Sequence, residues 1–209
     1  MISEKEASLE TLKDIRNIME RSARFLSLSG WSGVWAGAVA LAGAAIASSW
    51  ITNLPYDVDA EDSYTLAMMK FVVLAIGVFV VALIGAFYFT WRKTRAQGGN
   101  LWNSASKRMM LHMAIPLLAG GFFSAMFLYN GHDMYIAPAC LMFYGLALIN
   151  GSTYTVTDIK YMGLLEIGLG CISLFWLGYG LLFWTIGFGI LHILYGIIMW
   201  NKYDRKTTD

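Results

Sequence analysis

Six long apolar runs, separated by short polar segments, constrain this chain more than any other feature. Four of them cover residues 28–50, 66–91, 109–129 and 134–149, and two more lie within 161–200, joined by the short segment Leu177–Leu181. About 20 apolar residues in a helix cross a hydrocarbon core of about 30 Å. The chain is also 57% hydrophobic and only 14% charged, whereas soluble domains carry about 25% charged residues. These observations predict an all-α bundle of six transmembrane helices in a polytopic membrane protein.

The distribution of basic residues predicts the orientation of these helices. Of the 15 Lys and Arg residues, all but Lys70 fall in the N-terminal segment, in 92–108, in 150–160 or in the tail. The segment 52–65 between the first two runs holds four acids and no base. Cytoplasmic loops carry an excess of Lys and Arg. The pattern therefore predicts six spans with both termini in the cytoplasm.

The two ends of the chain are polar. In residues 1–27, Leu9, Leu12, Ile15 and Met19 recur at helical spacing among charged residues, which predicts a cytoplasmic amphipathic helix. Such a helix lies on the lipid surface or recruits a cytoplasmic protein partner. Residues 28–200 form the expected transmembrane domain, and 201–209 form a basic cytoplasmic tail. No cleavable signal peptide is evident in the opening residues.

Small residues dominate the first apolar run. Gly33 and Gly37 are four residues apart, as are Ala36, Ala40 and Ala44. Small residues at this spacing allow close contact between membrane helices. We expect this helix either to lie centrally in the bundle or to form the seam of a homo-oligomer.

Several function classes lack support in the sequence. The net charge of +1 gives no general attraction for nucleic acid. Cys140 and Cys171 are each alone in an apolar run, so they form no metal or redox motif. No phosphate-binding loop and no nucleophile with a neighbouring base can be recognised. We therefore expect a protein that is not an enzyme.

Two segments resemble a known family. The segments RFLSLSGWSGV (24–34) and GFGILHILYGIIM (187–199) are similar to those of a family of small bacterial six-span integral membrane proteins of unassigned function. The resemblance implies a location in the bacterial inner (plasma) membrane. It implies no substrate, cofactor or catalytic residue.

Two ionisable residues lie deep in the last two apolar runs. Glu166 and His192 are each 13 residues from Tyr179 in the connecting turn. At about 1.5 Å per residue, both lie roughly 20 Å from that turn, at one level of neighbouring helices. We expect the two side chains to meet. His112, about one turn into the third apolar run, is expected near the same level as a third member of the site.

Four interpretations of these residues remain open. In the first, Glu166 and His192 titrate a proton in a polar cavity, as in a proton-linked carrier, channel or sensor. In the second, His112, Glu166 and His192 bind a metal such as zinc, although no metal-binding spacing is present. In the third, His112 and His192 ligate a haem. In the fourth, Glu166 and His192 only link two helices, by about 1 kcal/mol.

We favour a proton-linked carrier, channel or sensor that uses Glu166 and His192. The alternatives are an interaction protein that recruits a cytoplasmic partner through its N-terminal helix, and a metal-binding or haem-binding membrane protein. The sequence identifies no cofactor, and the bilayer is the one partner that it requires.

Overall fold

The computed structural model describes residues 28–53 and 61–205, and the described chain is a bundle of helices without β-strands. The expected N-terminal amphipathic helix lies outside these residues. The helices have the following bounds: α2 Gly30–Thr52, α3 Glu61–Ala96, α4 Ser104–Tyr129, η1 Asp133–Tyr135, α5 Ile136–Ser152, α6 Asp158–Ser173, η2 Leu177–Tyr179, α7 Gly180–Trp184, η3 Thr185–Leu191, α8 His192–Met199 and η4 Trp200–Asp204. The predicted all-α bundle is confirmed.

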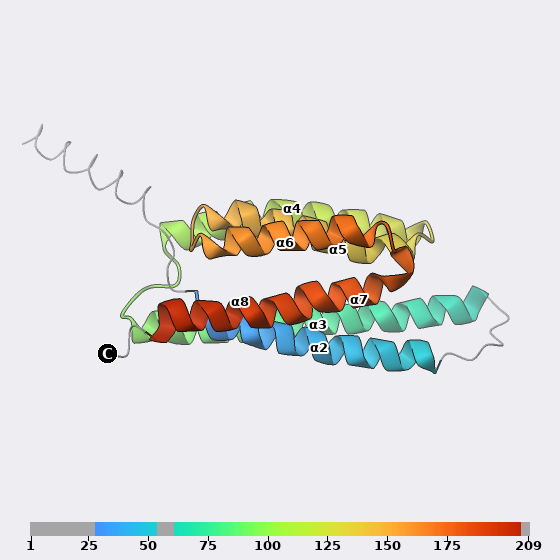
Figure 1. Cartoon of the computed structure of the whole chain (residues 1–209), viewed down its shortest axis with the longest axis horizontal. Helices are drawn as coiled ribbons and strands as arrows, with labels where there is room; N and C mark the ends of the chain where they lie inside the picture. Colours follow the sequence, from blue (N-terminus) through green and yellow to red (C-terminus); the bar gives the residue numbers. More distant parts are fainter. Residues whose placement is uncertain (1–27, 54–60, 206–209) are drawn as a thin grey trace, which may run out of the picture.

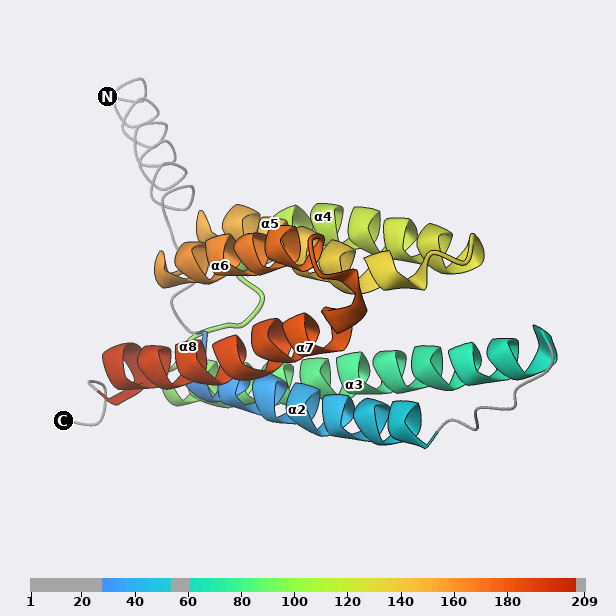
Figure 2. The ribbon, with the colours of Figure 1, turned by 45° about the vertical axis from the view of Figure 1, so that its right-hand side comes forward.

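The bundle has two layers, which are seen edge-on in Figure 1. The helices α4, α5 and α6 form one layer, with α5 in contact with both neighbours. The helices α2, α3 and α8 form the other layer, with α2 in contact with α3 and α8. The short helix α7 connects the layers and contacts α5 and α6 (Figure 2). We call these the α4–α6 layer and the α2–α8 layer.

The glycines of the first apolar run pack within the chain. A Cβ atom added to Gly37 would lie 2.6 Å from the Gly189 carbonyl oxygen, and one added to Gly33 would lie 3.0 Å from the Gly196 Cα. The helix α2 therefore lies in the middle of its own layer, and its Gly33 and Gly37 face contacts the last helix of the same chain. A homo-oligomer through the first span stays a prediction, and it would need another face of α2.

Helix lengths differ in places from the apolar runs. The helix α4 begins at Ser104 rather than near residue 109, because the Asn103 side chain accepts a hydrogen bond from the Ser106 N–H at 2.8 Å and caps it. The helix α3 extends over 36 residues and includes part of the expected outer loop. In contrast, α6 has only 16 residues, which is about 24 Å of helix.

Among the described residues, five stretches are long and apolar enough to cross a membrane. They are Gly30–Thr52, Leu66–Ala96, Ser104–Tyr129, Asp133–Ser152 and Leu177–Asp204. The remaining helix, α6, is shorter and carries Asp158, Lys160 and Glu166. The membrane character of the chain is therefore supported by these stretches, whereas the crossing of α6 stays a prediction.

The basic residues gather at one end of the bundle. We call this the basic end; its described Lys and Arg residues are Arg92, Lys93, Arg95, Lys107, Arg108, Lys160, Lys202 and Arg205. There the Asp204 carboxylate lies 2.7 Å from Lys93 Nζ and accepts a hydrogen bond from the Gly30 N–H at 3.0 Å. This contact ties the end of the last helix to the beginning of α2 (Figure 1).

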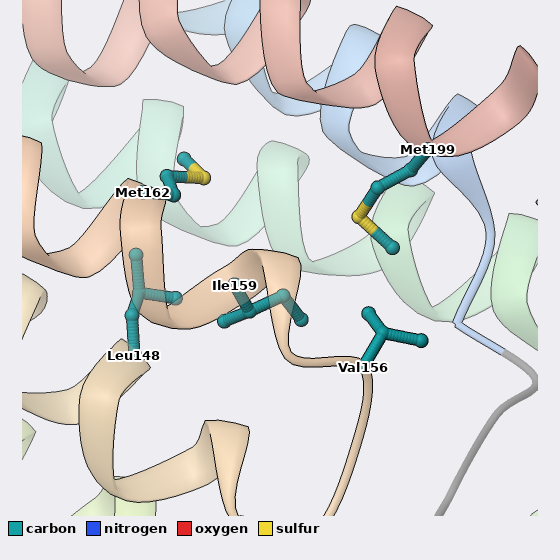
Figure 3. Close-up of a cluster of buried hydrophobic side chains, with 5 residues drawn as sticks. All are labelled: Leu148, Val156, Ile159, Met162 and Met199. Atoms are coloured by element: carbon teal, nitrogen blue, oxygen red, sulfur yellow. The ribbon is translucent and has the colours of Figure 1, made fainter. Parts of the chain in front are cut away.

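A cluster of apolar side chains joins the layers near the basic end. Met199 lies above Val156 and level with Met162, and Ile159 and Leu148 complete the cluster (Figure 3). Beside it, Lys202 Nζ lies 2.8 Å from an Asp158 oxygen, and the Tyr203 hydroxyl donates to the same oxygen at 2.7 Å. The layers are therefore in contact at both ends, through α7 and through this cluster.

Candidate functional site

The structure brings Glu166 and His192 together. His192 Nδ1 lies 3.6 Å from Glu166 Oε1. Glu166 projects from the middle of α6, and His192 is the first residue of α8. The contact was expected, because the two residues are equally distant from the turn that joins their helices.

The His192 ring is held by two polar contacts and two aromatic neighbours. Its Nδ1 atom lies 3.0 Å from the Gly187 carbonyl oxygen, and its Nε2 atom lies 2.8 Å from the Tyr144 hydroxyl. A carbonyl oxygen can only accept, so Nδ1 carries a proton and donates it to Gly187. When the ring is neutral, Nε2 then accepts a hydrogen bond from the Tyr144 hydroxyl. Tyr144 and Phe188 stack on the ring, with centroids 5.3 and 5.8 Å away.

Glu166 is buried and has no hydrogen-bond partner in the described part of the chain. Both of its carboxyl oxygens lack a partner, and its side chain is 0% exposed. The side chain is therefore not in contact with solvent. Buried polar atoms are normally hydrogen-bonded, and an unpartnered one costs roughly 1–3 kcal/mol. The Nδ1 proton of His192 is the donor within reach, and it is directed to Gly187 instead.

The local backbone explains why Gly187 accepts this proton. The segment Thr185–Leu191 is a π-helix, which opens the turn before His192. The ring of His192 reaches back five residues to the Gly187 carbonyl. A Cβ atom on Gly187 would lie 2.5 Å from Glu166 Oε2, so only glycine leaves room for the carboxyl.

The site lies between the two layers. Glu166 and Tyr144 belong to the α4–α6 layer, and His192 belongs to the α2–α8 layer. The hydrogen bond from Tyr144 to His192 and the close approach of Glu166 therefore join the layers through polar atoms. A change in the charge of either residue would alter the contact between the layers directly.

The structure does not bring His112 to this pair. His112 is exposed on α4, and its ring stacks on Tyr154 with centroids 4.8 Å apart. Its Nε2 atom lies 2.9 Å from the Tyr154 hydroxyl. The distance from the end of the run gives the depth of His112 but not the direction in which it points around the helix, and its ring packs on Tyr154.

The metal and haem interpretations gain no support from this arrangement. Across residues 28–53 and 61–205, no group of three His, Cys, Asp or Glu side chains could hold a metal ion. A haem ligated by His112 and His192 does not fit either, because the Nε2 atom of each ring is engaged by a tyrosine hydroxyl.

Sequence reasoning missed Tyr144 and Gly187. Tyrosines of membrane helices usually lie at the interfaces, whereas Tyr144 lies near the middle of α5, which covers Ile136–Ser152. That unusual depth was a signal that it has a polar partner inside the bundle. For Gly187 no comparable signal existed, because the glycine-rich last run gives no indication which glycine faces the carboxyl.

Comparisons with known proteins do not identify the chain. No family model, no curated protein and no solved structure matches it. The resemblance to a family of six-span bacterial proteins therefore stays a prediction, and the function must be argued from the site.

Proposed function

We propose that this chain is a six-span membrane protein that couples the binding of a proton at Glu166 and His192 to a movement of its two layers, as in a small carrier or sensor. The observation that carries the proposal is the Glu166 carboxyl, which is fully buried, has no hydrogen-bond partner among the described residues, and lies 3.6 Å from a histidine. Ionisable residues inside membrane helices often belong to proton relays and transport pathways.

The energetics support two alternative states of this site. A charged side chain at the centre of a membrane helix costs about 2.5–3.5 kcal/mol on insertion scales. A neutral carboxyl avoids that cost, whereas a carboxylate needs a donor. The His192 Nδ1–H group, 3.0 Å from Gly187 and 3.6 Å from Glu166, can supply this donor after a small rotation of the ring. Loss of the proton from Glu166 would thus draw His192 away from Gly187.

This exchange would act on the contact between the layers. His192 carries the hydrogen bond to Tyr144 across the boundary between the layers, so a rotation of its ring weakens or redirects that bond. In the described conformation the pair is closed to water, with Glu166 0% and His192 7% exposed. A carrier must open such a site to one side of the membrane. Separation of the two layers would expose the site without breaking helix contacts inside either layer.

The membrane orientation follows the positive-inside rule. Arg92, Lys93, Arg95, Lys107 and Arg108 lie in or beside the connection from α3 to α4, at the basic end. We propose that this end faces the cytoplasm of a bacterial cell, with both termini on that side. The beginning of α2 and the end of η4 meet there, as the contact between Gly30 and Asp204 requires, and this favours an even number of crossings.

A structural role is the second candidate, and the tight closure of the pair favours it. A polar contact between membrane helices stabilises their packing by about 0.6–2 kcal/mol without any transport. The two roles predict different behaviour. A structural link holds the layers in one arrangement at every pH, whereas a proton-coupled site changes their separation when it titrates.

The distance between the layers tests the proposal. Spin labels at exposed positions Lys160 on α6 and Arg92 on α3, after Cys140 and Cys171 are replaced by alanine, report this distance by pulsed electron resonance in nanodiscs. We expect a distribution that changes with pH and becomes independent of pH in Glu166→Gln. The matched control, His112→Gln, should keep the change. A distribution that does not depend on pH, or depends on it equally in Glu166→Gln, would assign the pair a structural role.

A further inference from the structure

A hollow of about 280 Å³ lies beside the last turns of α3 at the basic end. Its walls come from α3 and from the connection to α4, and they include Phe87, Trp91, Arg95, Asn100 and Trp102. The hollow is distant in sequence from the helices that carry Glu166 and His192. It combines a cation, polar backbone and aromatic rings at the point where the apolar run of α3 ends.

The hollow results from the way in which α3 ends. Gly98 has a φ of +66°, and its N–H donates to the Arg95 carbonyl oxygen at 3.1 Å. The Gly99 N–H donates to the Thr94 carbonyl oxygen at 3.0 Å. This pair of bonds is a Schellman motif, which ends a helix with a glycine in the left-handed conformation. It ends α3 there, and Trp91 on the helix and Trp102 in the connection after it both line the hollow.

Arg95 supplies a charge that is not neutralised within the described chain. Its guanidinium lies 5.5 Å from the centroid of the Trp91 ring, in a cation–π contact. Of the carboxylates in the described residues, none forms an ion pair with it. Guanidinium groups bind phosphate through two parallel hydrogen bonds. A phosphate in the hollow would therefore meet a pre-positioned arginine.

A second donor, from the connection after α3, also lines the hollow. The Asn100 side chain accepts a hydrogen bond from the Trp102 N–H at 3.0 Å through its oxygen. This arrangement leaves the amide NH₂ group of Asn100 to donate to a ligand. A hydroxyl or an ester oxygen of a headgroup would suit that donor.

The surface below the hollow is apolar. Phe87 lines the hollow and is 54% exposed. Leu83, Val80 and Ile76 follow at helical spacing on α3, and all of them are exposed. Residues four, seven and eleven positions apart lie on one face of a helix. This face continues the hollow as an apolar track along which an acyl chain can lie.

We propose that this hollow binds the phosphate headgroup of an anionic phospholipid, with one acyl chain along α3. The headgroup would sit on Arg95 between Trp91 and Trp102, and tryptophans are characteristic of the headgroup level of a membrane. The volume suits a headgroup, whereas the acyl chains require the exposed face of the helix. The proposal does not depend on the role of Glu166.

Lipid titration followed by native mass spectrometry tests the proposal. The purified full chain in detergent is titrated with phosphatidylglycerol and with phosphatidylcholine of identical acyl chains. We expect tighter binding of phosphatidylglycerol, and we expect Arg95→Gln to weaken it about tenfold. Trp102→Ala should weaken the binding of both lipids. The control Arg92→Gln removes the same charge from the same helix at an exposed position outside the hollow, and it should leave affinity unchanged.

Three outcomes would overturn the proposal. Equal losses in Arg95→Gln and Arg92→Gln would show that only the general charge of this end attracts the lipid. Equal affinities for the two lipids would show that the headgroup charge is not recognised. In a third arm, inorganic phosphate is added as a competitor; displacement of phosphatidylglycerol at a phosphate concentration equal to that of the lipid would identify a site for the free anion instead.

Discussion

Two histidine–tyrosine pairs in this molecule have almost the same geometry and very different surroundings. His112 and Tyr154 stack with centroids 4.8 Å apart and share a hydrogen bond of 2.9 Å. His192 and Tyr144 stack with centroids 5.3 Å apart and share a hydrogen bond of 2.8 Å. The first pair is exposed, whereas His192 is buried next to Glu166.

The difference shows that residue type and pairing do not by themselves make a site. The exposed pair can exchange its hydrogen bond with solvent, so its loss costs little. The buried pair joins two layers, and beside it lies a carboxyl without a partner among the described residues. In the buried pair, therefore, the gain or loss of one proton has a large effect on stability, whereas in the exposed pair solvent compensates for it.

Removal of each histidine ring provides the largest contrast. In His192→Ala the aromatic neighbours Tyr144 and Phe188 lose the ring that packs on both of them, and the cavity that remains should lower the free energy of unfolding by about 3 kcal/mol. In His112→Ala we expect a change within about 0.5 kcal/mol. Denaturation in mixed micelles measures both. Equal losses would remove the distinction between the pairs.

Filling the space between Gly187 and the Glu166 carboxyl should have the next largest effect. In Gly187→Ala the new methyl group would press on Glu166 Oε2, which lies 2.5 Å from the added atom. We expect a destabilisation of about 2 kcal/mol, because side chains must shift in a packed region. The matched control is Gly168→Ala, where no atom lies within 4 Å of the added Cβ. Denaturation in mixed micelles again measures the free energy of unfolding. If Gly187→Ala is as stable as this control, Gly187 does not confine the Glu166 carboxyl.

Removal of the tyrosine hydroxyls compares the contribution of one hydrogen bond in the buried pair with that of one in the exposed pair. Tyr144→Phe leaves the buried Nε2 atom of His192 without its partner, and we expect a loss of about 1 kcal/mol in the free energy of unfolding. Tyr154→Phe exposes the Nε2 atom of His112 to solvent, so its effect should be close to zero. If both variants behave alike, the buried hydrogen bond contributes no more than the exposed one.

The smallest effect concerns the ion pair between Asp158 and Lys202 at the basic end. Burial raises the pKa of Asp158, but hydrogen bonds from Lys202 and Tyr203 outweigh burial and hold this pKa below its ordinary value. The stabilisation that the carboxylate supplies is therefore present above a pH of about 4. It is lost as the pH falls through the lowered pKa of the folded protein.

Asp158→Asn removes this contribution. We expect the variant to be slightly less stable than the parent protein at neutral pH and equally stable in acid below that lowered pKa. Thermal melts across this pH range, at low salt, measure the difference. A stability difference that stays constant with pH would show that Asp158 acts through packing and not through its charge.

Much of the fold could be predicted from the sequence, because an apolar run of about 20 residues indicates a helix that can cross a membrane. The meeting of Glu166 and His192 was also predictable, since both depths are counted from the same turn at Tyr179. Counting gives depth but not direction around the helix axis, and for this reason it did not reveal that the His112 ring packs on Tyr154. The pairing of α2 with α8 was unpredictable, because small residues such as Gly33 show that a close neighbour exists without identifying it.

The central claim is that Glu166 exchanges a proton inside the bundle, and infrared spectroscopy tests it most directly. Difference spectra between two pH values, recorded on the protein in nanodiscs, reveal the carbonyl stretch of a protonated carboxyl group. Our account predicts a band that changes with pH, is absent in Glu166→Gln and persists in His112→Gln. A carboxyl band that stays constant over the whole pH range in which the protein is folded, or one that survives in Glu166→Gln, would contradict it.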